Sequence, residues 1–268
     1  MSPPGVAPDL ARAADVVAAR ATALGRPLWL LASTTSTNDE ARRGARQGAP
    51  HGATWVAEVQ TAGRGRQGRA WFSAPGEGLL FSVLLRQVPD PSRAPQIALV
   101  AGLAVRDAVA RAAPRATVAI KWPNDVVVGS RKVAGVLVEA VSAGPRVESI
   151  VVGIGVNVHA RAFPDDIAQR ATSVALNVQP GDGPPDRAEI LADVLSGLDH
   201  DLHVATARGL GMVRARLEAC DALRGRRVRG DAGDEGMAAG IDDEGRLLVR
   251  RDDGVMARWA AGEVSLLG

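Results

Sequence analysis

The region from Val118 to Val158 constrains the fold most, because its strand-forming runs lie too close together for crossover helices. Four β-branched runs are separated only by short turns that contain proline or glycine. They are Val118–Lys121, Val126–Val128, 132–143 and 149–158. Short turns join antiparallel strands, whereas parallel neighbours need a dozen or more connecting residues. We therefore predict a mixed, largely antiparallel sheet and exclude a doubly wound one.

The other elements complete an α+β pattern. Helical periodicity occurs at 8–24, 38–47, 94–112, 186–205 and 209–220, and strand patterns occur at 29–31, 54–60 and 78–86. Thr37 and Glu40 fit the S/T-x-x-E capping box at the start of the second helix. After Leu223 the pattern changes to five short alternating runs at 227–229, 236–241, 246–250, 255–259 and 263–267. This change predicts a small β-barrel of five strands.

Composition limits the class of protein. A hydrophobic content of 46% and a net charge of +2 fit a globular chain without strong electrostatic attraction to nucleic acid. Cys220 is the single cysteine, which excludes an internal disulfide and favours a reducing compartment. The N-terminus lacks a signal-peptide pattern, and the apolar run at 97–105 is too short to span a bilayer. We expect a cytoplasmic protein with no membrane partner.

A glycine- and arginine-rich stretch, residues 60–71, is the first candidate site. Its glycines allow close backbone approach to a ligand, and its arginines suit phosphate or carboxylate oxygens. The spacing Gly63-x-Gly65-x-x-Gly68 matches the dinucleotide fingerprint, but a strand-like segment follows where that motif needs a helix. A Walker loop would need Gly-Lys-Ser/Thr, which is absent. A surface loop without a ligand stays open as an alternative.

The second candidate site contains the only two lysines of the chain, Lys121 and Lys132; the other 30 of its 32 basic residues are arginine. Lys121 begins the sequence Lys-Trp-Pro-Asn-Asp, whose Asn124 and Asp125 carry hard oxygen ligands suited to Mg²⁺ beside a phosphate. A turn at a strand end is the alternative for this motif. Lys132 precedes Gly135, where the missing side chain leaves room for a ligand.

The strand at 149–158 carries the third candidate site. Gly153 and Gly155 interrupt a Val/Ile-rich run, where glycine weakens pairing unless something packs closely. A bulge is the structural alternative. Asn157 follows with an amide that could pair with an adenine edge.

The order and spacing of these motifs, together with Ser36-Thr37-Asn38 and the C-terminal Gly262-Glu263-Val264-Ser265-Leu266, closely resemble biotin–protein ligases. The resemblance begins near residue 28. It implies a class II synthetase-like catalytic domain, which we place at residues 1–222, and an SH3-like barrel at residues 223–268. It also implies ATP and Mg²⁺ as cofactors and biotin as substrate. Biotin would first form biotinyl-5′-adenylate and then pass to a lysine of a carrier protein.

The resemblance also implies residue roles. The biotin-binding set would be Ser36, Thr37, Asn38, Gln60, Arg64, Gly65, Arg66, Lys132 and Gly135. The nucleotide-binding set would be Arg69, Trp71, Asn124, Gly153, Gly155 and Asn157. Arg66, Lys132, Lys121 and Asp125 would be catalytic, and Asp125 would be the metal ligand.

The implied partner is the biotin carboxyl carrier domain of an acyl-CoA or pyruvate carboxylase. A homodimer stays open. Residues 8–24 provide room for one helix and not for a winged DNA-binding domain, so we expect no specific DNA partner. Some family members carry a basic residue after the C-terminal motif, where this chain has Leu267-Gly268. A contact between the C-terminus and ATP is therefore uncertain from the sequence.

Two other functions are alternatives for such a chain. A lipoate–protein ligase or octanoyltransferase shares the fold, but the Arg-Arg-x-x-Gly-Gly-Gly motif and the histidine-containing strand typical of those families are absent. An RNA-binding module would present basic residues and aromatics across the barrel. Acidic residues offset the arginines there instead, at positions such as Asp242, Asp243 and Glu244.

Overall fold

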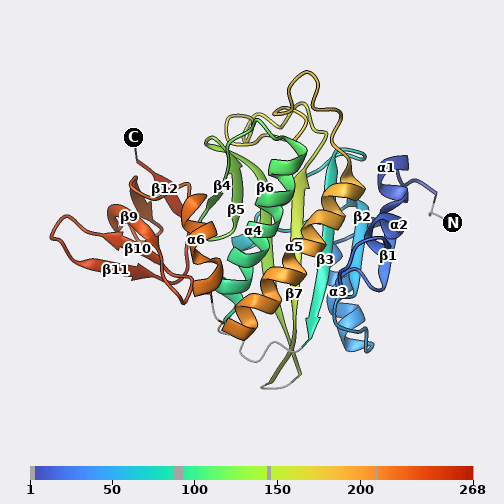
Figure 1. Ribbon diagram of the computed structural model, residues 1–268, viewed down its shortest axis with the longest axis horizontal. Helices are drawn as coiled ribbons and strands as arrows, with labels where there is room; N and C mark the ends of the chain where they lie inside the picture. The colour runs from blue at the N-terminus through green and yellow to red at the C-terminus, as the bar shows by residue number, and fades with distance from the viewer. Residues whose placement is uncertain (1–3, 87–92, 144–145, 209, 268) are drawn as a thin grey trace.

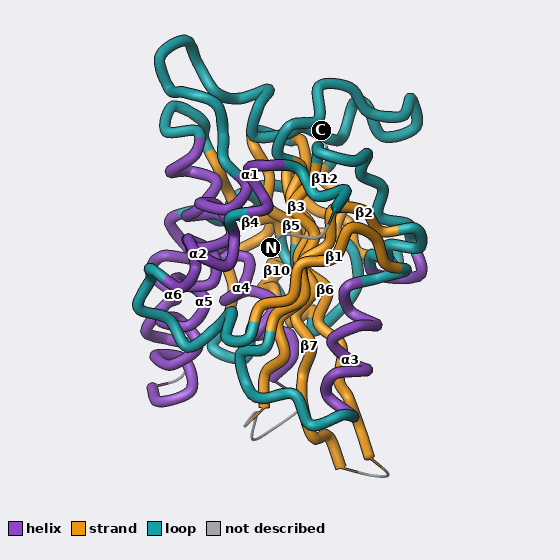
Figure 2. The backbone as a smooth tube through the Cα atoms, turned by 90° about the vertical axis from the view of Figure 1, so that its right-hand side faces the viewer, coloured by secondary structure: helices purple, strands orange, loops and turns teal. Residues whose placement is uncertain are grey.

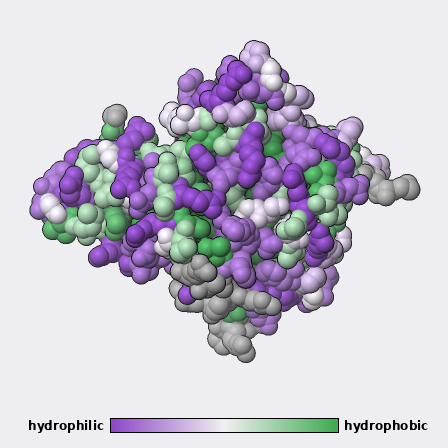
Figure 3. Space-filling view, in the orientation of Figure 1, coloured by the Kyte–Doolittle hydropathy of each residue, from purple (hydrophilic) through white to green (hydrophobic). Residues whose placement is uncertain are grey.

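The computed structural model describes residues 4–86, 93–143, 146–208 and 210–267. A larger unit contains a seven-stranded sheet, and a smaller five-stranded sheet lies beside it at the C-terminal end (Figure 1). The α+β class expected from the sequence is confirmed. Among these residues, no helix is both long and apolar enough to cross a membrane. Hydrophilic residues dominate the face drawn in Figure 3, with smaller hydrophobic areas between them.

The larger sheet has the strand order β1-β2-β3-β7-β6-β5-β4. β1 and β2 are parallel, and every other neighbouring pair is antiparallel. The predicted mixed, largely antiparallel sheet is therefore confirmed. Its strands are β1 (Leu28–Thr34), β2 (Thr54–Gln60), β3 (Gly78–Arg86), β4 (Val118–Lys121), β5 (Asp125–Val128), β6 (Arg131–Ala143) and β7 (Arg146–Asn157). The turn predicted at Pro145 lies outside the described residues.

Helices cover both faces of this sheet. In Figure 2, α4 and α5 lie on one face and α3 on the other. The apolar residues of α4, among them Leu99 and Leu103, are buried against the sheet because they recur at helical spacing. The helices are α1 (Pro8–Ala11), α2 (Ala13–Ala18), α3 (Thr37–Arg46), α4 (Ala94–Ala112), α5 (Arg187–Arg208) and α6 (Gly211–Ala219), with a 3₁₀ turn at Arg66–Gly68.

The smaller sheet has the order β11-β10-β9-β8-β12 and is antiparallel throughout. Its strands are β8 (Arg227–Gly230), β9 (Glu235–Ile241), β10 (Leu247–Arg250), β11 (Met256–Trp259) and β12 (Val264–Leu266). They match the five runs expected after Leu223, and we refer to this unit as the barrel. Trp122, 1% exposed, joins the two units because its Nε1 donates to the Gly245 carbonyl oxygen at 2.9 Å. The domain division at residues 222 and 223 stays a prediction.

Two local predictions were wrong. The expected helix at 8–24 is two short helices, interrupted at Arg12 and ended at Ala18. The Thr37–Glu40 capping box does not form, because Ser36 is the N-cap residue and Thr37 is already the first helical residue. The Glu40 carboxylate instead accepts a hydrogen bond from the Thr34 hydroxyl at 2.7 Å.

A buried ionic cluster ties the N-terminal helix to the sheet. The Arg187 side chain is fully buried and donates to Asp9 at 2.7 Å and to Glu58 at 2.8 Å. Glu58 also accepts the backbone N–H groups of Ala7 and Gly76, at 2.9 and 2.7 Å. The cluster therefore fixes the end of the loop that leads from β2 to β3.

Candidate active site

The start of α3 meets the end of β2 through a set of polar contacts. Gln60 Oε1 accepts the backbone N–H of Thr37 at 2.7 Å and lies 3.0 Å from its hydroxyl. Ser36 and Thr37 are each 3% exposed. The parallel pairing of β1 with β2 places Thr34 opposite Gln60 and so positions both segments at one edge. The first predicted cluster, Ser36, Thr37, Asn38 and Gln60, is thus brought together.

Arg64 is held by a carboxylate of α3. Its guanidinium donates two hydrogen bonds to Asp39, at 2.8 and 2.7 Å. These bonds lower the pKa of Asp39 from its ordinary value, and the same contact raises the pKa of Arg64. A ligand anion that binds Arg64 would have to replace or share a bidentate carboxylate contact.

The glycine-rich stretch forms a closed turn. Gly65 N–H donates to the Arg69 carbonyl oxygen at 2.7 Å, and Trp71 N–H donates to the Gly63 carbonyl oxygen at 2.9 Å. Gln67 between them has φ of 54°, a backbone conformation that non-glycine residues adopt rarely. The turn presents Arg66 and Arg69 toward the barrel.

Contacts between this turn and the barrel were missed by the sequence analysis. Arg66 donates to the Gly262 carbonyl oxygen at 3.2 Å and to Asn124 Oδ1 at 3.1 Å. Arg69 pairs with Glu263. Each of the three arginines of the turn therefore has an acceptor within the protein, and the barrel supplies two of those acceptors.

Lys132 lies between a carboxylate and an indole. Its Nζ is 2.6 Å from Asp125 Oδ1 and 5.4 Å from the centroid of the Trp71 ring, within the range of a cation–π contact. The indole rests on the two paired glycines of β6 and β7. A Cβ at Gly155 would lie 2.5 Å from the indole, and a Cβ at Gly135 would lie 2.9 Å from Lys132.

Gly155 and Gly135 thus leave room for Trp71 and Lys132, which explains why glycines occur at these positions inside strands. No bulge is recorded at Gly135, Gly153 or Gly155. The Trp71 Nε1 is buried without a hydrogen-bond partner among the described residues. Such a donor is costly unless a ligand or water satisfies it.

The remaining predicted residues lie around this centre. Asn124 Nδ2 donates to the Val136 carbonyl oxygen at 2.8 Å, which fixes the break between β4 and β5. Asn157 donates to the Thr172 carbonyl oxygen at 3.0 Å. Lys121 is the strand-register partner of Asp125. Within the described ranges its side chain makes no hydrogen bond or ion pair. Gly268, discussed above for the C-terminus, lies outside those ranges.

The donor set around Asp125 fits an ion that arrives with phosphate. Mg²⁺ is usually held by one or two carboxylates together with substrate phosphates. Asp125 supplies one carboxylate, and the described part of the chain contains no group of three metal-binding side chains. These residues therefore suit a nucleotide-bound ion and not a preformed cage.

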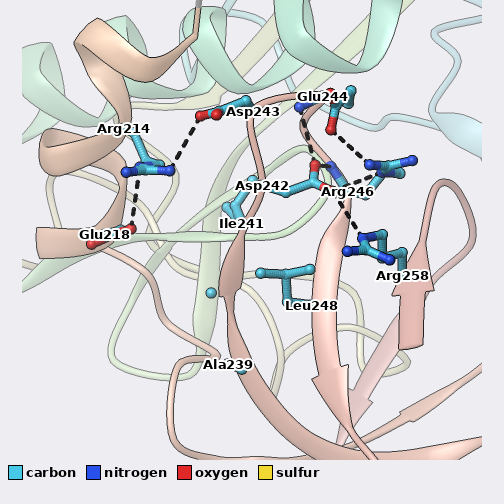
Figure 4. A pocket seen from close by; sticks show the side chains of 11 residues that line it. Arg214, Glu218, Ala239, Ile241, Asp242, Asp243, Glu244, Arg246, Leu248 and Arg258 are labelled. Carbon is cyan, nitrogen blue, oxygen red and sulfur yellow. Dashed lines mark hydrogen bonds and ion pairs between the residues drawn. The ribbon is translucent and has the colours of Figure 1, made fainter. Parts of the chain in front are cut away.

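A separate cleft of about 350 Å³ lies between α6 and the barrel (Figure 4). Its charged groups already pair with one another: Arg214 contacts Glu218 and Asp243, and Arg246 contacts Asp242. None of the predicted site residues lines it. The chemistry described above belongs to the other side of the barrel, where Gly262 and Glu263 contact the glycine-rich turn.

Comparison with known proteins gives two family matches. Residues 30–157 match the biotin/lipoate A/B protein ligase family, and residues 225–267 match the biotin protein ligase C-terminal domain. The chain is 36% identical to a biotin–[acetyl-CoA-carboxylase] ligase from Paracoccus denitrificans, over 82% of this chain and 93% of that one. It is 37% identical to the protein of the same name from Mycobacterium tuberculosis, over 84% and 83%.

Among solved structures, the biotin protein ligase from Aquifex aeolicus in complex with biotin and ATP superposes with a TM-score of 0.76. The two sequences are 30% identical, and the match covers 90% of this chain and 98% of that one. Both units of the fold therefore have a counterpart in one known architecture.

Proposed function

Because this chain belongs to the biotin protein ligase family, we propose that it attaches biotin to a carrier protein at the expense of ATP. Biotin is activated as biotinyl-5′-AMP, and the acyl group then passes to a lysine amine. The lipoate alternative has less support, because the relatives and the Aquifex structure described above are biotin ligases.

One observation carries the proposal: of the only two lysines of the chain, one contacts the Asp125 carboxylate at a glycine-lined centre and the other is the strand-register partner of Asp125. Lys132 contacts Asp125 at 2.6 Å, and Lys121 is the register partner of Asp125. Adenylation places a carboxylate against the α-phosphate, so negative charge develops where a compact ammonium stabilises it most. An arginine-biased chain that keeps lysine here supports a role for the ammonium group itself.

In the first half-reaction, a biotin carboxylate oxygen bonds to the α-phosphorus of ATP as the bond to pyrophosphate breaks. We assign to Lys132 the contact with both groups and to Arg66 the closure over the phosphate. Mg²⁺ held by Asp125 would neutralise phosphate charge. In the second, the lysine amine of the carrier bonds to the acyl carbon, AMP leaves, and the amine loses its proton to a base for which Asp125 is the candidate.

The proposed binding roles follow the family resemblance. Ser36, Thr37 and Gln60, with Arg64 and Gly65, would surround the biotin ring system, and Gly135 would leave space beside it. Trp71, Arg69 and Asn157 would contact the nucleotide, with Asn124, Gly153 and Gly155 supporting that end. The C-terminal unit contributes through Glu263 and Gly262, which hold the glycine-rich turn.

The proposed partner is a biotin carboxyl carrier domain of an acyl-CoA or pyruvate carboxylase. The names of the Paracoccus and Mycobacterium relatives, which specify acetyl-CoA carboxylase, support this choice. A cytoplasmic location, a homodimer and the lack of a specific DNA partner stay predictions.

The test uses the purified chain with ATP, Mg²⁺ and either biotin or lipoate, analysed by mass spectrometry. We expect biotinyl-5′-AMP and pyrophosphate in the biotin arm. A gain of one biotin on the lysine of an added carrier domain should follow. Adenylate formation with lipoate but not with biotin would overturn the proposal.

A further inference from the structure

Asn38 follows Thr37 in α3, and protein groups surround its side-chain amide. It is 4% exposed and lies flat on β7, since a Cβ at Gly153 would overlap its amide oxygen. Its Nδ2 donates to Glu139 at 2.6 Å, and its Oδ1 accepts from the Ser82 hydroxyl at 2.6 Å. Both ends of the amide are therefore used within the protein.

The Glu139 carboxylate fixes the direction of the amide. An ionised carboxylate only accepts hydrogen bonds, so the NH₂ end of Asn38 must face it. The oxygen end then faces Ser82, whose hydroxyl is fully buried on β3 opposite Gly153. Because an amide oxygen cannot donate, the single hydroxyl hydrogen of Ser82 goes to Asn38.

Thr37 is the next group along this chain of contacts. Its Oγ lies 2.7 Å from Ser82 Oγ and 3.0 Å from Gln60 Oε1. Since the Ser82 hydrogen is already committed, both neighbours present lone pairs to Thr37. The Thr37 hydroxyl therefore donates its hydrogen to either Ser82 or Gln60. The Thr37 oxygen then offers only lone pairs to a ligand, so it accepts a hydrogen bond and does not donate one.

We propose that Glu139, Asn38 and Ser82 are positioning residues that orient the Thr37 hydroxyl as a hydrogen-bond acceptor and so select a ligand N–H group. The inference rests on the proposed function, because the ureido ring of biotin carries two N–H donors. It replaces the predicted direct contact of Asn38 with biotin, and it assigns roles to Ser82 and Glu139, which the motif analysis did not include.

The test measures discrimination between a donor and an acceptor at one ring position. The probes are biotin and its two cyclic carbamate analogues, each with one ureido N–H replaced by oxygen. Titration calorimetry gives the ratio of dissociation constants. The wild-type chain should bind at least one analogue about 100-fold more weakly than biotin, because the unmatched polar pair is buried.

Glu139→Gln keeps the size of the side chain but no longer fixes which end of the Asn38 amide faces residue 139. The Asn38 amide can then turn over, Ser82 can donate to Thr37, and Thr37 can donate to the ligand oxygen. The 100-fold ratio should fall to about tenfold or less. Glu40→Gln is the matched control, because it makes the same acid-to-amide change on α3 at a carboxylate that contacts Thr34 and Arg43. Its ratio should stay within about twofold of the wild-type value.

Ser82→Ala gives an independent measurement. It should raise the dissociation constant for biotin about tenfold, because Thr37 loses the neighbour that orients its hydroxyl. The expected change in binding free energy is that of about one ordinary hydrogen bond. Ser149→Ala is its control, since Ser149 is a second buried serine of the same sheet and its hydroxyl has no partner among the described residues. Ser149→Ala should leave biotin binding within about twofold.

The outcomes separate the two proposals. If the wild-type chain binds biotin but Glu139→Gln keeps the full discrimination ratio, the positioning role is wrong and the ligase function stands. Equal binding of biotin and both carbamates by the wild-type chain would also overturn the positioning role. A wild-type chain that binds no biotin would overturn both.

Discussion

Replacing Arg187 by methionine would test the buried cluster that joins the N-terminal helix to the sheet. The guanidinium is fully buried, and among the described residues it is the cation that pairs with Glu58, which is 2% exposed. Methionine keeps much of the side-chain volume but removes the charge. Glu58 would then carry a buried charge with no cation beside it in the described part of the chain, while the partly exposed Asp9 would keep only its contact with His159 at 3.3 Å.

The size of the effect follows from burial. Removing one partner of a buried ion pair costs about 3–5 kcal/mol, because it leaves an uncompensated buried charge. At about 2–4 °C per kcal/mol for a chain of this size class, the midpoint of thermal unfolding should fall by about 6–20 °C. Arg20→Met is the matched control: the Arg20–Glu189 pair is exposed, with side chains 42% and 47% accessible. An exposed pair contributes about 0–1 kcal/mol.

The pH dependence gives a second signature. Burial is the largest single influence and raises the pKa of Asp9 and of Glu58. The hydrogen bonds and charge of Arg187, together with His159 at Asp9 and the backbone N–H groups at Glu58, nevertheless leave each pKa below its ordinary value. The stabilisation is therefore complete above the ordinary values of 3.8 and 4.5, and it is lost as pH falls through the lower native pKa values. In the variant, the His159 contact of Asp9 and the backbone hydrogen bonds to Glu58 remain. Burial is no longer offset by Arg187, so each pKa rises relative to the wild-type value and protonation relieves part of the destabilisation.

The assay is urea unfolding of wild type, Arg187→Met and Arg20→Met at about pH 7 and about pH 5. The deficit of Arg187→Met relative to wild type should be largest at neutral pH and smaller in acid. A deficit below about 1 kcal/mol at pH 7, or one that does not shrink at pH 5, would refute the reasoning.

The remaining predictions concern the proposed chemistry. Lys132→Arg should lower pyrophosphate release about 100-fold and Lys121→Arg much less, since the planar guanidinium misplaces the charge; equal, near-wild-type rates would contradict the role of Lys132. Arg66→Gly removes a charge-assisted contact worth about 1.5–3 kcal/mol, so biotinyl-AMP should escape at least about tenfold faster and label an unrelated lysine-rich protein. If that protein stays unlabelled while the adenylate is still made and retained, Arg66 does not hold the adenylate. Gly155→Ala should displace the Trp71 indole and weaken ATP binding about tenfold, measured by calorimetry; unchanged affinity would separate the indole from nucleotide binding.

Much of the fold was predictable because its signals are local. The short turns around Gly129 fix antiparallel pairing, and the helix at Ala94–Ala112 has the predicted bounds because its apolar spacing and flanks agree. The division of the N-terminal segment at Arg12 was not predictable. That segment packs against α5, which is distant in sequence, and Asp9 is held there by Arg187.

The site residues that could be predicted are those that are unusual in their surroundings. Residues whose roles depend on strand pairing across the sheet could not be predicted. Lys132 and Gly155 stand out because lysine is rare in this chain and glycine is unexpected inside a strand. Ser82 gives no such signal, since one serine in an apolar strand is ordinary, and its role depends on the strand register that places it opposite Gly153. The Thr37–Glu40 motif misled for the same reason: Gln60 and Ser82 engage Thr37 instead.

The indole between Lys132 and the strand glycines also has an optical consequence. The chain contains five tryptophans and no tyrosine, so its intrinsic fluorescence is purely that of indole. Trp71 is the tryptophan that lies 5.4 Å from the Lys132 ammonium, and its Nε1 is buried without a partner within the described structure. A ligand that draws the ammonium away, or that accepts from this N–H, changes the electric field across one identified ring. Occupancy of the site can therefore be followed from the emission wavelength of the unlabelled protein, with Trp71→Phe, which keeps the other four tryptophans, as the reference.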